Sequence, residues 1–295
     1  MRFLCITTGI ALLFYLAYNL RGNFSVYRLV LMETTLAHHI AAVVAGLASG
    51  IVSEIGGAGS LISLPMLIGL GLPPSVANGT NRVGVMTQYT MGYIRYLTHR
   101  RIPHREAAIL SVTLVLGAIA GAFFAVRIAG VIFNWIFIGV MILTILFTFF
   151  SPPPADRPDK TADPVGRSRL ADYGIFLLLG LYCGMIQAGM AYLMYYVLVT
   201  RLHTETRTAD AIKTYMSMIV TPFALAVFVW FGHIDWELGA CVALGGGFGG
   251  WVGEKFVERK DTRTVKDCFM VALILSVIYM LLFVQLHFHD GIMYL

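Results

Sequence analysis

The sequence has few charged residues, and this shortage limits what the protein can be. Only 13% of the 295 residues are charged, whereas 58% are hydrophobic and the mean hydropathy is +0.78. A water-soluble domain could not bury so many apolar side chains, so the composition predicts an all-α polytopic membrane protein. The formal net charge of +5 does not indicate nucleic-acid binding, because Lys and Arg stand in short segments between apolar runs, where they set membrane topology.

Signals for a cleaved leader, disulfides, metals and catalysis are also scarce. No small-x-small cleavage site precedes Arg21, so the apolar run at 3–20 predicts an uncleaved first span. The four cysteines lie in apolar segments without CxxC spacing, which is typical of buried, inert thiols. No HExxH motif is present, and we attribute the cluster of His287, His289 and Asp290 to chance in a short tail. We therefore expect no bound metal, no cofactor and no enzyme activity.

Apolar segments long enough to cross a hydrocarbon core of roughly 30 Å divide the chain into two similar halves. GLASG at 46–50 resembles GLYCG at 180–184, and the cluster at 77–82 matches the one at 208–213. An internal repeat is the simplest explanation. We expect an N-terminal helix and connector (1–35), a first transmembrane repeat (36–150), a Pro-rich cytoplasmic linker (151–171) and a second repeat with a short tail (172–295).

The distribution of basic residues predicts that the two repeats are inverted. The loop at 98–105 is strongly basic, whereas its counterpart at 232–237 is acidic. In the next pair of loops the bias reverses, because Arg127 stands nearly alone and residues 255–266 are rich in Lys and Arg. Since cytoplasmic loops collect Lys and Arg, we expect a multi-pass protein of the bacterial inner membrane with its N-terminus in the cytoplasm and its C-terminus outside.

A break interrupts the first apolar segment of each repeat, and in the first repeat this break is rich in glycine. Residues 53–65 read SEIGGAGSLISLP, and glycines followed by Pro65 prevent an undisturbed helix. One continuous helix over 36–72 would be about 55 Å long, so a broken helical hairpin followed by three transmembrane helices is expected. In the second repeat the segment is shorter, and a full crossing stays open.

A helix that starts at the break would offer unpaired N–H groups and a positive dipole end to an anion. Unwound backbone at membrane depth is tolerated only where it is buried in protein or lines a wet cavity. The alternative is that the glycines merely allow helices to pack closely.

These motifs resemble those of the TauE/SafE sulfite exporter family, also called the toluene sulfonate uptake permease family. The resemblance rests on GxxxG, the glycine cluster, Pro65-Met-Leu67, the run from Gly71 to Pro74, and Thr80-Asn81-Arg82 after Ala77, and it covers about residues 40 to 285. It implies an inverted-repeat transporter, often an exporter, of sulfite, sulfonates or related small organic anions. Two departures are Ala58 in the glycine triplet and a second repeat that keeps only Gly189.

Polar side chains on the helices after each break are the remaining site candidates. Asn81, Gln88, Gly92 and Arg95 share one helical face, as do Asp210, Lys213, Ser217 and Thr221. If the faces meet, Arg82 and Lys213 could hold one anion from two sides. The alternatives are that both snorkel to the interface, or that Lys213 only pairs with Asp210. The expected substrate-binding residues are Gly56, Gly57, Gly59, Ser60, Thr80, Asn81, Arg82, Gln187, Gly189 and Lys213.

Glu54 and Asp210 are the candidates for proton coupling. An ionisable side chain at membrane depth is costly and indicates an ion pathway or a counter-ion. The alternative for Glu54 is a structural pair with Arg82.

Together these features predict a secondary transporter of small sulfur-containing anions, in which protons drive alternating access. Its expected partners are the anion, protons and the lipid bilayer, and a homo-oligomer is left open. Transport of small carboxylates or other anions is the alternative. An intramembrane enzyme that uses Ser49 is less favoured, because no histidine base stands in the spans. A channel is also less favoured, because it would need a continuous polar lining, whereas here the polar residues cluster near the middle of the two halves.

Overall fold

The computed structural model of the chain describes residues 36–56, 59–99, 104–150, 170–259 and 270–282. Every regular element in these ranges is an α-helix, which confirms the all-helical prediction. The expected N-terminal span, the C-terminal tail with His287 and most of the linker lie outside the described residues. The first half contains α2 (Leu36–Gly56), α3 (Ser60–Gly69), α4 (Pro74–His99), α5 (His104–Ala125) and α6 (Gly130–Phe150). The second half contains α7 (Leu170–Met185), α8 (Met190–Thr200), α9 (Thr206–Trp230), α10 (Trp236–Arg259) and a helix at Met270–Leu282.

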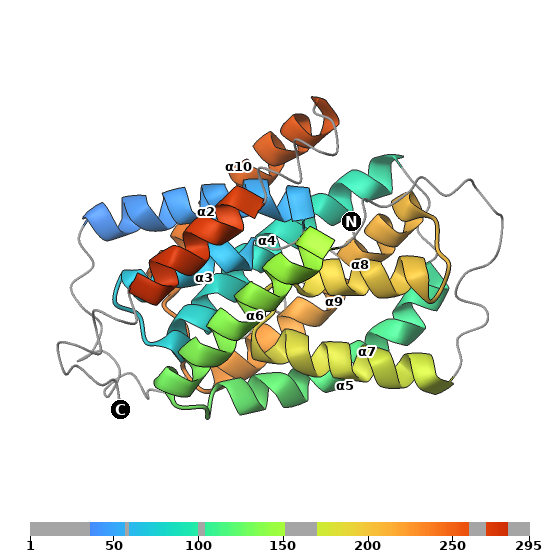
Figure 1. Cartoon of the computed structure of the whole chain (residues 1–295), viewed down its shortest axis with the longest axis horizontal. Helices are drawn as coiled ribbons and strands as arrows, with labels where there is room; N and C mark the ends of the chain where they lie inside the picture. The colour runs from blue at the N-terminus through green and yellow to red at the C-terminus, as the bar shows by residue number, and fades with distance from the viewer. Residues whose placement is uncertain (1–35, 57–58, 100–103, 151–169, 260–269, 283–295) are drawn as a thin grey trace.

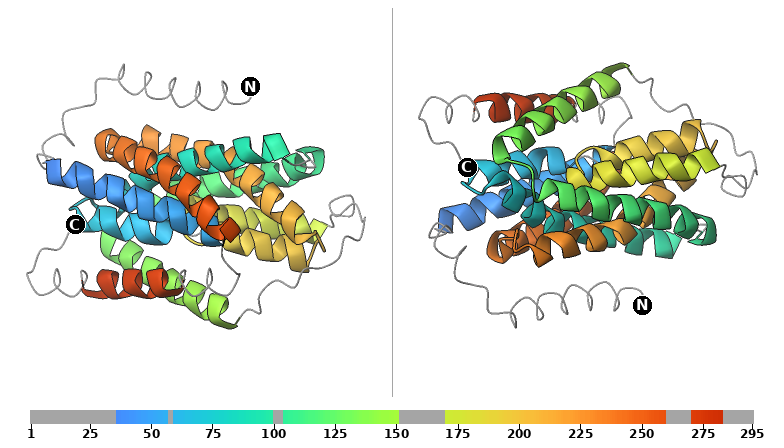
Figure 2. Two further views of the ribbon diagram at one scale, coloured as in Figure 1. Left: turned by 90° about the horizontal axis from the view of Figure 1, so that it is seen from above. Right: turned by 90° about the horizontal axis from the view of Figure 1, so that it is seen from below.

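The helices of the two halves are interleaved rather than packed as separate bundles. Helices α4 and α9 contact each other, α2 packs along α10, and α5 packs along α7 (Figure 1). Helix α6 and the helix at Met270–Leu282 lie side by side at the edge of the bundle (Figure 2). Each half therefore depends on the other for burial of its apolar faces.

The contacts follow a two-fold pattern when α2, α4 and α5 are matched with α7, α9 and α10. The contact of α2 with α10 then corresponds to that of α7 with α5, and the contact of α4 with α10 to that of α9 with α5. Helices α4 and α9 run antiparallel, because Gly92 near the end of α4 meets Thr214 near the start of α9. At the other end of the pair, Arg82 lies over the ring of Phe228.

Glycines allow the close contacts of α2 with α10 and of α7 with α5. A Cβ atom on Gly46 would lie 2.4 Å from the Val242 carbonyl oxygen of α10, and one on Gly180 would lie 2.1 Å from the Leu114 carbonyl oxygen of α5. Backbones approach so closely only where no side chain intervenes. The repeated GLASG and GLYCG stretches thus serve helix packing.

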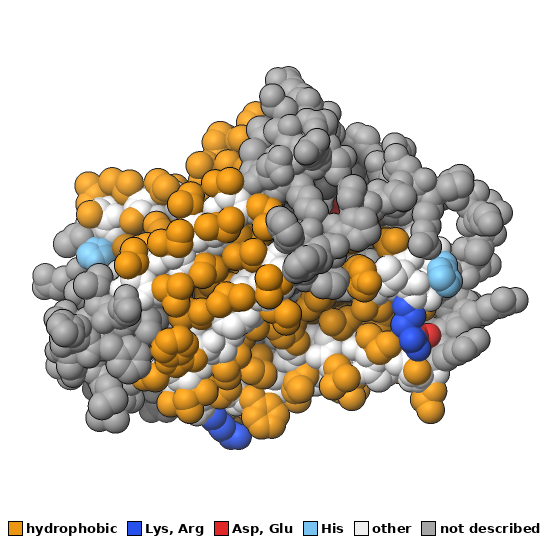
Figure 3. Space-filling view, in the orientation of Figure 1, with side chains coloured by type: hydrophobic (Ala, Val, Ile, Leu, Met, Phe, Trp, Pro, Cys, Tyr) orange, Lys and Arg blue, Asp and Glu red, His pale blue; other side chains and the backbone are white. Residues whose placement is uncertain are grey.

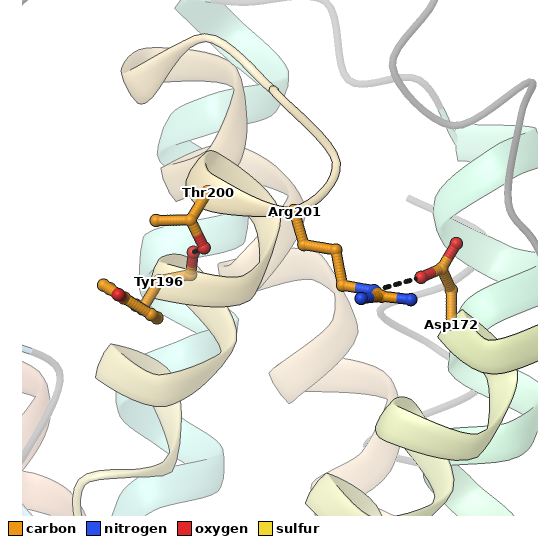
Figure 4. A network of polar contacts seen from close by, with 4 residues as sticks. All are labelled: Asp172, Tyr196, Thr200 and Arg201. Atoms are coloured by element: carbon orange, nitrogen blue, oxygen red, sulfur yellow. Dashed lines mark hydrogen bonds and ion pairs between the residues drawn. The ribbon is translucent and has the colours of Figure 1, made fainter.

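Both broken segments fold back as hairpins. In the first, Gly59 and Ser63 of the α3 region lie against Ser49, in the middle of α2. In the second, Arg201 at the end of α8 pairs with Asp172 in the first turn of α7, with Nε 2.6 Å from Oδ1 (Figure 4). The end of α8 thus returns to the start of α7, so the full crossing that the sequence left open is not formed.

The outer surface is apolar, as a bilayer requires. Among the described residues, three helical spans are long and apolar enough to cross a membrane, namely Leu36–Glu54, Ala107–Ala125 and Thr208–Trp230. Large apolar side chains such as Leu143, Leu178 and Leu244 are exposed. Figure 3 shows hydrophobic side chains over most of the described surface on one face, with Lys and Arg near its margins. The chain is an integral, multi-pass membrane protein.

Candidate functional site

The first break places the N-terminus of α3 in the protein interior. Helix α3 begins at Ser60, which is 5% exposed, and its N-cap residue Gly59 has no side chain to accept a bond from the first turn. The amides of Ile62 and Ser63 donate to the Gly59 carbonyl oxygen, whereas those of Ser60 and Leu61 have no acceptor within the helix. They lie at the positive end of the helix dipole. Gly57 lies outside the described residues, and Gly56 ends α2.

Gly59 also shows that the packing explanation of the break glycines holds in part. A Cβ atom at this position would lie 2.3 Å from the Ser49 carbonyl oxygen and 2.7 Å from Ser49 Oγ. Gly59 is therefore required for the contact between α3 and α2, whatever it also does for a ligand.

A network of four polar side chains joins this break to α4. Ser63 Oγ donates to Asn81 Oδ1 at 2.5 Å and lies 3.2 Å from Ser49 Oγ. Gln88 Nε2 donates to Ser49 Oγ at 3.1 Å. All four side chains are at most 5% exposed, so their hydrogen bonds are hardly in competition with bulk water. Two members of the predicted polar face, Asn81 and Gln88, thus meet α2 and α3.

Arg82 crosses from the first half to the end of α7 in the second. Its side chain is fully buried, and its Nη2 donates to the carbonyl oxygens of Cys183 at 3.0 Å and Gly184 at 2.5 Å. Its Nη1 donates to Gln187 Oε1 at 3.1 Å, and its guanidinium carbon lies 4.8 Å from the centroid of the Phe228 ring. These contacts rule out a snorkelling Arg82. The oxygens that a helix end leaves unpaired are satisfied here by the other half.

At the second break, two residues have a left-handed backbone conformation with positive φ, which bulky residues avoid. Gln187 has φ of 60° and Gly189, the N-cap residue of α8, has φ of 69°. A non-glycine residue in the left-handed region is uncommon and often marks a functional constraint. Gln187 Nε2 donates to Thr221 Oγ1 at 2.8 Å, and Tyr182 donates its hydroxyl to the Ala188 carbonyl oxygen. Gln187 thus connects Arg82 to α9.

Several buried polar atoms around this centre have no hydrogen-bond partner within the described ranges. They include Asn78 Oδ1, Asn81 Nδ2 and Arg82 Nε. Asn78, Asn81 and Arg82 occupy neighbouring positions on one side of α4, and Asn78 Nδ2 also donates to the Met185 carbonyl oxygen at 2.6 Å. Because an unpaired buried polar group is costly, such a cluster indicates that something else binds there.

Lys213 does not lie opposite Arg82. It pairs with Asp210 on its own helix, and its Nζ is 5.9 Å from the centroid of the Tyr195 ring. Because Thr214 meets Gly92, Lys213 lies near the far end of α4, and Arg82 to Gly92 spans about 15 Å along that helix. The expectation that Arg82 and Lys213 hold one small anion together is therefore wrong. The reason is that α4 and α9 are antiparallel, so Arg82 near the start of α4 and Lys213 near the start of α9 lie at opposite ends of the helix pair.

Thr80 and Glu54 have neighbours other than Arg82. Thr80 Oγ1 accepts a hydrogen bond from the Asp235 amide at 2.9 Å, at the start of α10. Glu54 lies near Gly250 of α10, where an added Cβ atom would be 3.8 Å from Glu54 Oε1. Among the described residues no carboxylate forms an ion pair with Arg82, so the structural pair of Glu54 with Arg82 is not formed.

Three polar residues of the centre were missed by reasoning from the sequence: Ser49, Ser63 and Asn78. Ser49 was considered only as a catalytic nucleophile. Ser60 and Ser63 are three residues apart, and this spacing on one face of a short helix was the available signal.

Comparison with known proteins gives consistent results. The family model for the sulfite exporter TauE/SafE matches residues 41–280. A "Probable membrane transporter protein" of Haemophilus influenzae is 25% identical over 228 residues, which cover 77% of this chain and 88% of that protein. A "Probable membrane transporter protein ORF9" of Sinorhizobium sp. is 24% identical over 252 residues, covering 83% of this chain and 94% of that protein. No solved structure matches.

Proposed function

We propose that this chain, which belongs to the sulfite exporter TauE/SafE family, is a proton-coupled secondary transporter of sulfite or organosulfonates that works by alternating access. Membership of the family makes the chain a membrane transporter and not an enzyme. The identity of the anion, its coupling to protons and the direction of transport, which we take to be export, belong to the proposal.

The observation that carries the proposal is that Arg82, although fully buried, has no carboxylate partner among the described residues. Its partners are two carbonyl oxygens, an amide oxygen and an aromatic ring, all of them neutral. A buried charge is expensive unless an opposite charge accompanies it. An anion beside Arg82 would supply that charge, and the free Nε–H offers it a donor.

The donors nearby suit an oxyanion. Asn81 Nδ2 is buried and unpaired, and Asn81 is joined through Ser63 to the first turn of α3. In our proposal a sulfur oxyanion binds between the N-terminus of α3, Asn81 and Arg82, with Gln187 and Gly189 shaping the opposite wall. Gly56, Gly59 and Ser60 would supply backbone close to the ligand. Thr80 contributes indirectly, through its bond to the α10 start.

Alternating access would use the relation between the two halves. The exchanged pairing of α2 with α10 and of α7 with α5, and the antiparallel α4 and α9, support an inverted repeat. In such a fold, one half can rock against the other around a central site. Lys213 and Asp210 would then meet the anion at the other end of the α4–α9 pair. Glu54 is the proposed proton carrier.

A thermal-shift panel on the purified protein tests the proposal. A ligand that binds only the folded protein must stabilise it. We expect sulfite, methanesulfonate or taurine to raise the melting temperature, and acetate and other matched carboxylates to do so less. The same compound should then move across liposomes that contain the protein. A larger shift with carboxylates would replace the sulfur assignment by a carboxylate one, and no shift with any anion would contradict an anion site.

A further inference from the structure

We infer that Ser63, held by Ser49 and Gln88, is a positioning residue that turns the side-chain amide of Asn81 so that its NH₂ group faces the transported anion. The inference rests on the proposed function, because it concerns the same site. It adds three residues to that site and states which end of Asn81 the anion meets.

The first step is the single proton of the Ser63 hydroxyl. Three acceptors surround Ser63 Oγ, at 2.5 Å (Asn81 Oδ1), 3.2 Å (Ser49 Oγ) and 3.3 Å (Gly59 carbonyl oxygen). A hydroxyl donates one hydrogen bond, and the shortest contact is the one to Asn81. The Ser63 proton therefore points at Asn81 Oδ1.

The second step is the supply of hydrogen bonds from the other side. Gln88 Nε2 donates to Ser49 Oγ, which leaves the Ser49 proton free to point at Ser63 Oγ. The result is a directed chain in which Gln88 donates to Ser49, Ser49 to Ser63, and Ser63 to Asn81. Chains of this kind polarise each bond and strengthen it in a low-dielectric interior.

The start of the chain is fixed by packing. Gln88 lies against Gly246 of α10, where an added Cβ atom would be 2.8 Å from Gln88 Nε2. The chain therefore runs from the α10 contact through α4, α2 and α3 and returns to α4 two helical turns earlier. All four side chains are buried, so the directions along the chain cannot easily be reset by water.

The third step concerns the other end of the Asn81 amide. With Oδ1 held by Ser63, Nδ2 points away from the chain, and it is buried without a partner in the described structure. An NH₂ group donates and cannot accept. Together with Arg82 Nε–H, it offers two unused donors. Oxygen atoms that carry no proton, as in sulfite and sulfonates, can accept from both.

The test compares three single substitutions in the purified full-length protein, with sulfite as the probe. Ser63→Ala removes the anchor of Asn81, so the amide can rotate and sulfite binding should weaken about tenfold. Ser63→Thr keeps the hydroxyl and should restore affinity to within about twofold. The control is Ser111→Ala, because Ser111 is also buried but bonds only to Ala107 on its own helix at 2.7 Å.

The measurements are the dissociation constant for sulfite from thermal shifts, and KM and maximal rate in liposomes. A positioning role predicts a higher KM with an unchanged maximal rate for Ser63→Ala, and unchanged values for Ser111→Ala. Sulfite affinity of Ser63→Ala equal to that of the parent protein would overturn the inference and leave the proposed function standing. A parent protein that binds methanesulfonate but not sulfite is compared with its variants in methanesulfonate, and a parent protein that binds neither would overturn both. Should Ser63→Ala fail to fold, Ser49→Ala breaks the same chain one step earlier and should also weaken sulfite binding.

Discussion

The guanidinium of Arg82 caps the end of α7, with Nη2 3.0 Å from the carbonyl oxygen of Cys183. The cation thus meets the negative end of a helix dipole. Because Arg82 belongs to α4 and Cys183 to the other half of the chain, the contact couples the two halves. If the second hairpin moves relative to α4, the Arg82 side chain must either lose its contact with the end of α7 or move together with it.

Substitution of Arg82 should weaken anion binding. Arg82→Gln removes the charge, and we expect at least about thirtyfold weaker binding of sulfite, as for a lost charged hydrogen bond. Arg82→Lys should be intermediate, because Lys keeps the charge but lacks the planar fork. The control is Arg127→Gln, since Arg127 lies over the rings of Phe123 and Phe231 away from the site. Unchanged affinity in Arg82→Gln would remove Arg82 from the site.

Substitution of Glu54 should change the pH dependence of transport. Glu54→Gln removes the titrating group while keeping a similar shape, so transport should become insensitive to pH with the protein still folded. Uptake into liposomes at several internal and external pH values measures this. Glu237→Gln is the matched control, because Glu237 is an exposed carboxylate at the start of α10. A Glu54→Gln profile identical to that of the parent protein would exclude Glu54 from coupling.

Substitution of the interface glycines should destabilise the protein. An added methyl group at Gly180 would lie 2.1 Å from the Leu114 carbonyl oxygen, so Gly180→Ala should lose about 1–3 kcal/mol by overpacking. Gly174 is on the same helix with nothing within 4 Å of an added Cβ atom. Gly174→Ala should therefore be neutral or stabilising by up to about 1 kcal/mol. Equal melting temperatures for the two variants would contradict the close approach of α5 and α7.

The ion pair of Asp172 and Arg201 should contribute to closure of the second hairpin. The Asp172 side chain is only 6% exposed, so Arg201→Gln removes a cation from beside a buried carboxylate and should destabilise more than Asp172→Asn. A double-mutant cycle in detergent should give a coupling energy of about 0.5–3 kcal/mol, as for residues in contact. A coupling energy of zero would mean that the ion pair does not contribute to closure of the second hairpin.

Asp235, in the loop before α10, should give a pH-dependent contribution to stability. Burial raises the pKa of its carboxyl group, although its hydrogen bond from the Leu238 amide opposes the shift. The folded protein thus keeps this proton at pH values at which the unfolded chain has lost it. The stabilisation is complete below the unfolded pKa and is lost as the pH rises through the folded pKa.

Asp235→Asn keeps an oxygen for the Leu238 amide and removes the titration. Its melting temperature should therefore fall less than that of the parent protein as the pH rises. Asp235→Ala also removes the acceptor and should cost about 0.5–2 kcal/mol at every pH, as for a lost helix cap. Parallel pH profiles for Asp235→Asn and the parent protein would contradict the raised pKa.

The sequence by itself determined the class of the protein and the positions of its breaks. Low charge and long apolar runs exclude a soluble fold, and the glycine cluster marks the point where α2 ends at Gly56 and α3 begins at Ser60, because backbone geometry is a local property. Pro65 does not end a helix, since it lies inside α3. The same locality explains why the polar faces of α4 and α9 could be recognised from their spacing alone.

Only the tertiary structure decided which partners those polar residues have. Arg82 bonds to residues 101 to 105 positions away, and Ser63 meets Asn81 because α3 folds back on α2. The antiparallel arrangement of α4 and α9 separates Arg82 from Lys213, although the two stand at matching places in the sequence. The physical reason is that hydrogen bonds and ion pairs depend on distances of about 3 Å in space, which the packing of distant helices sets.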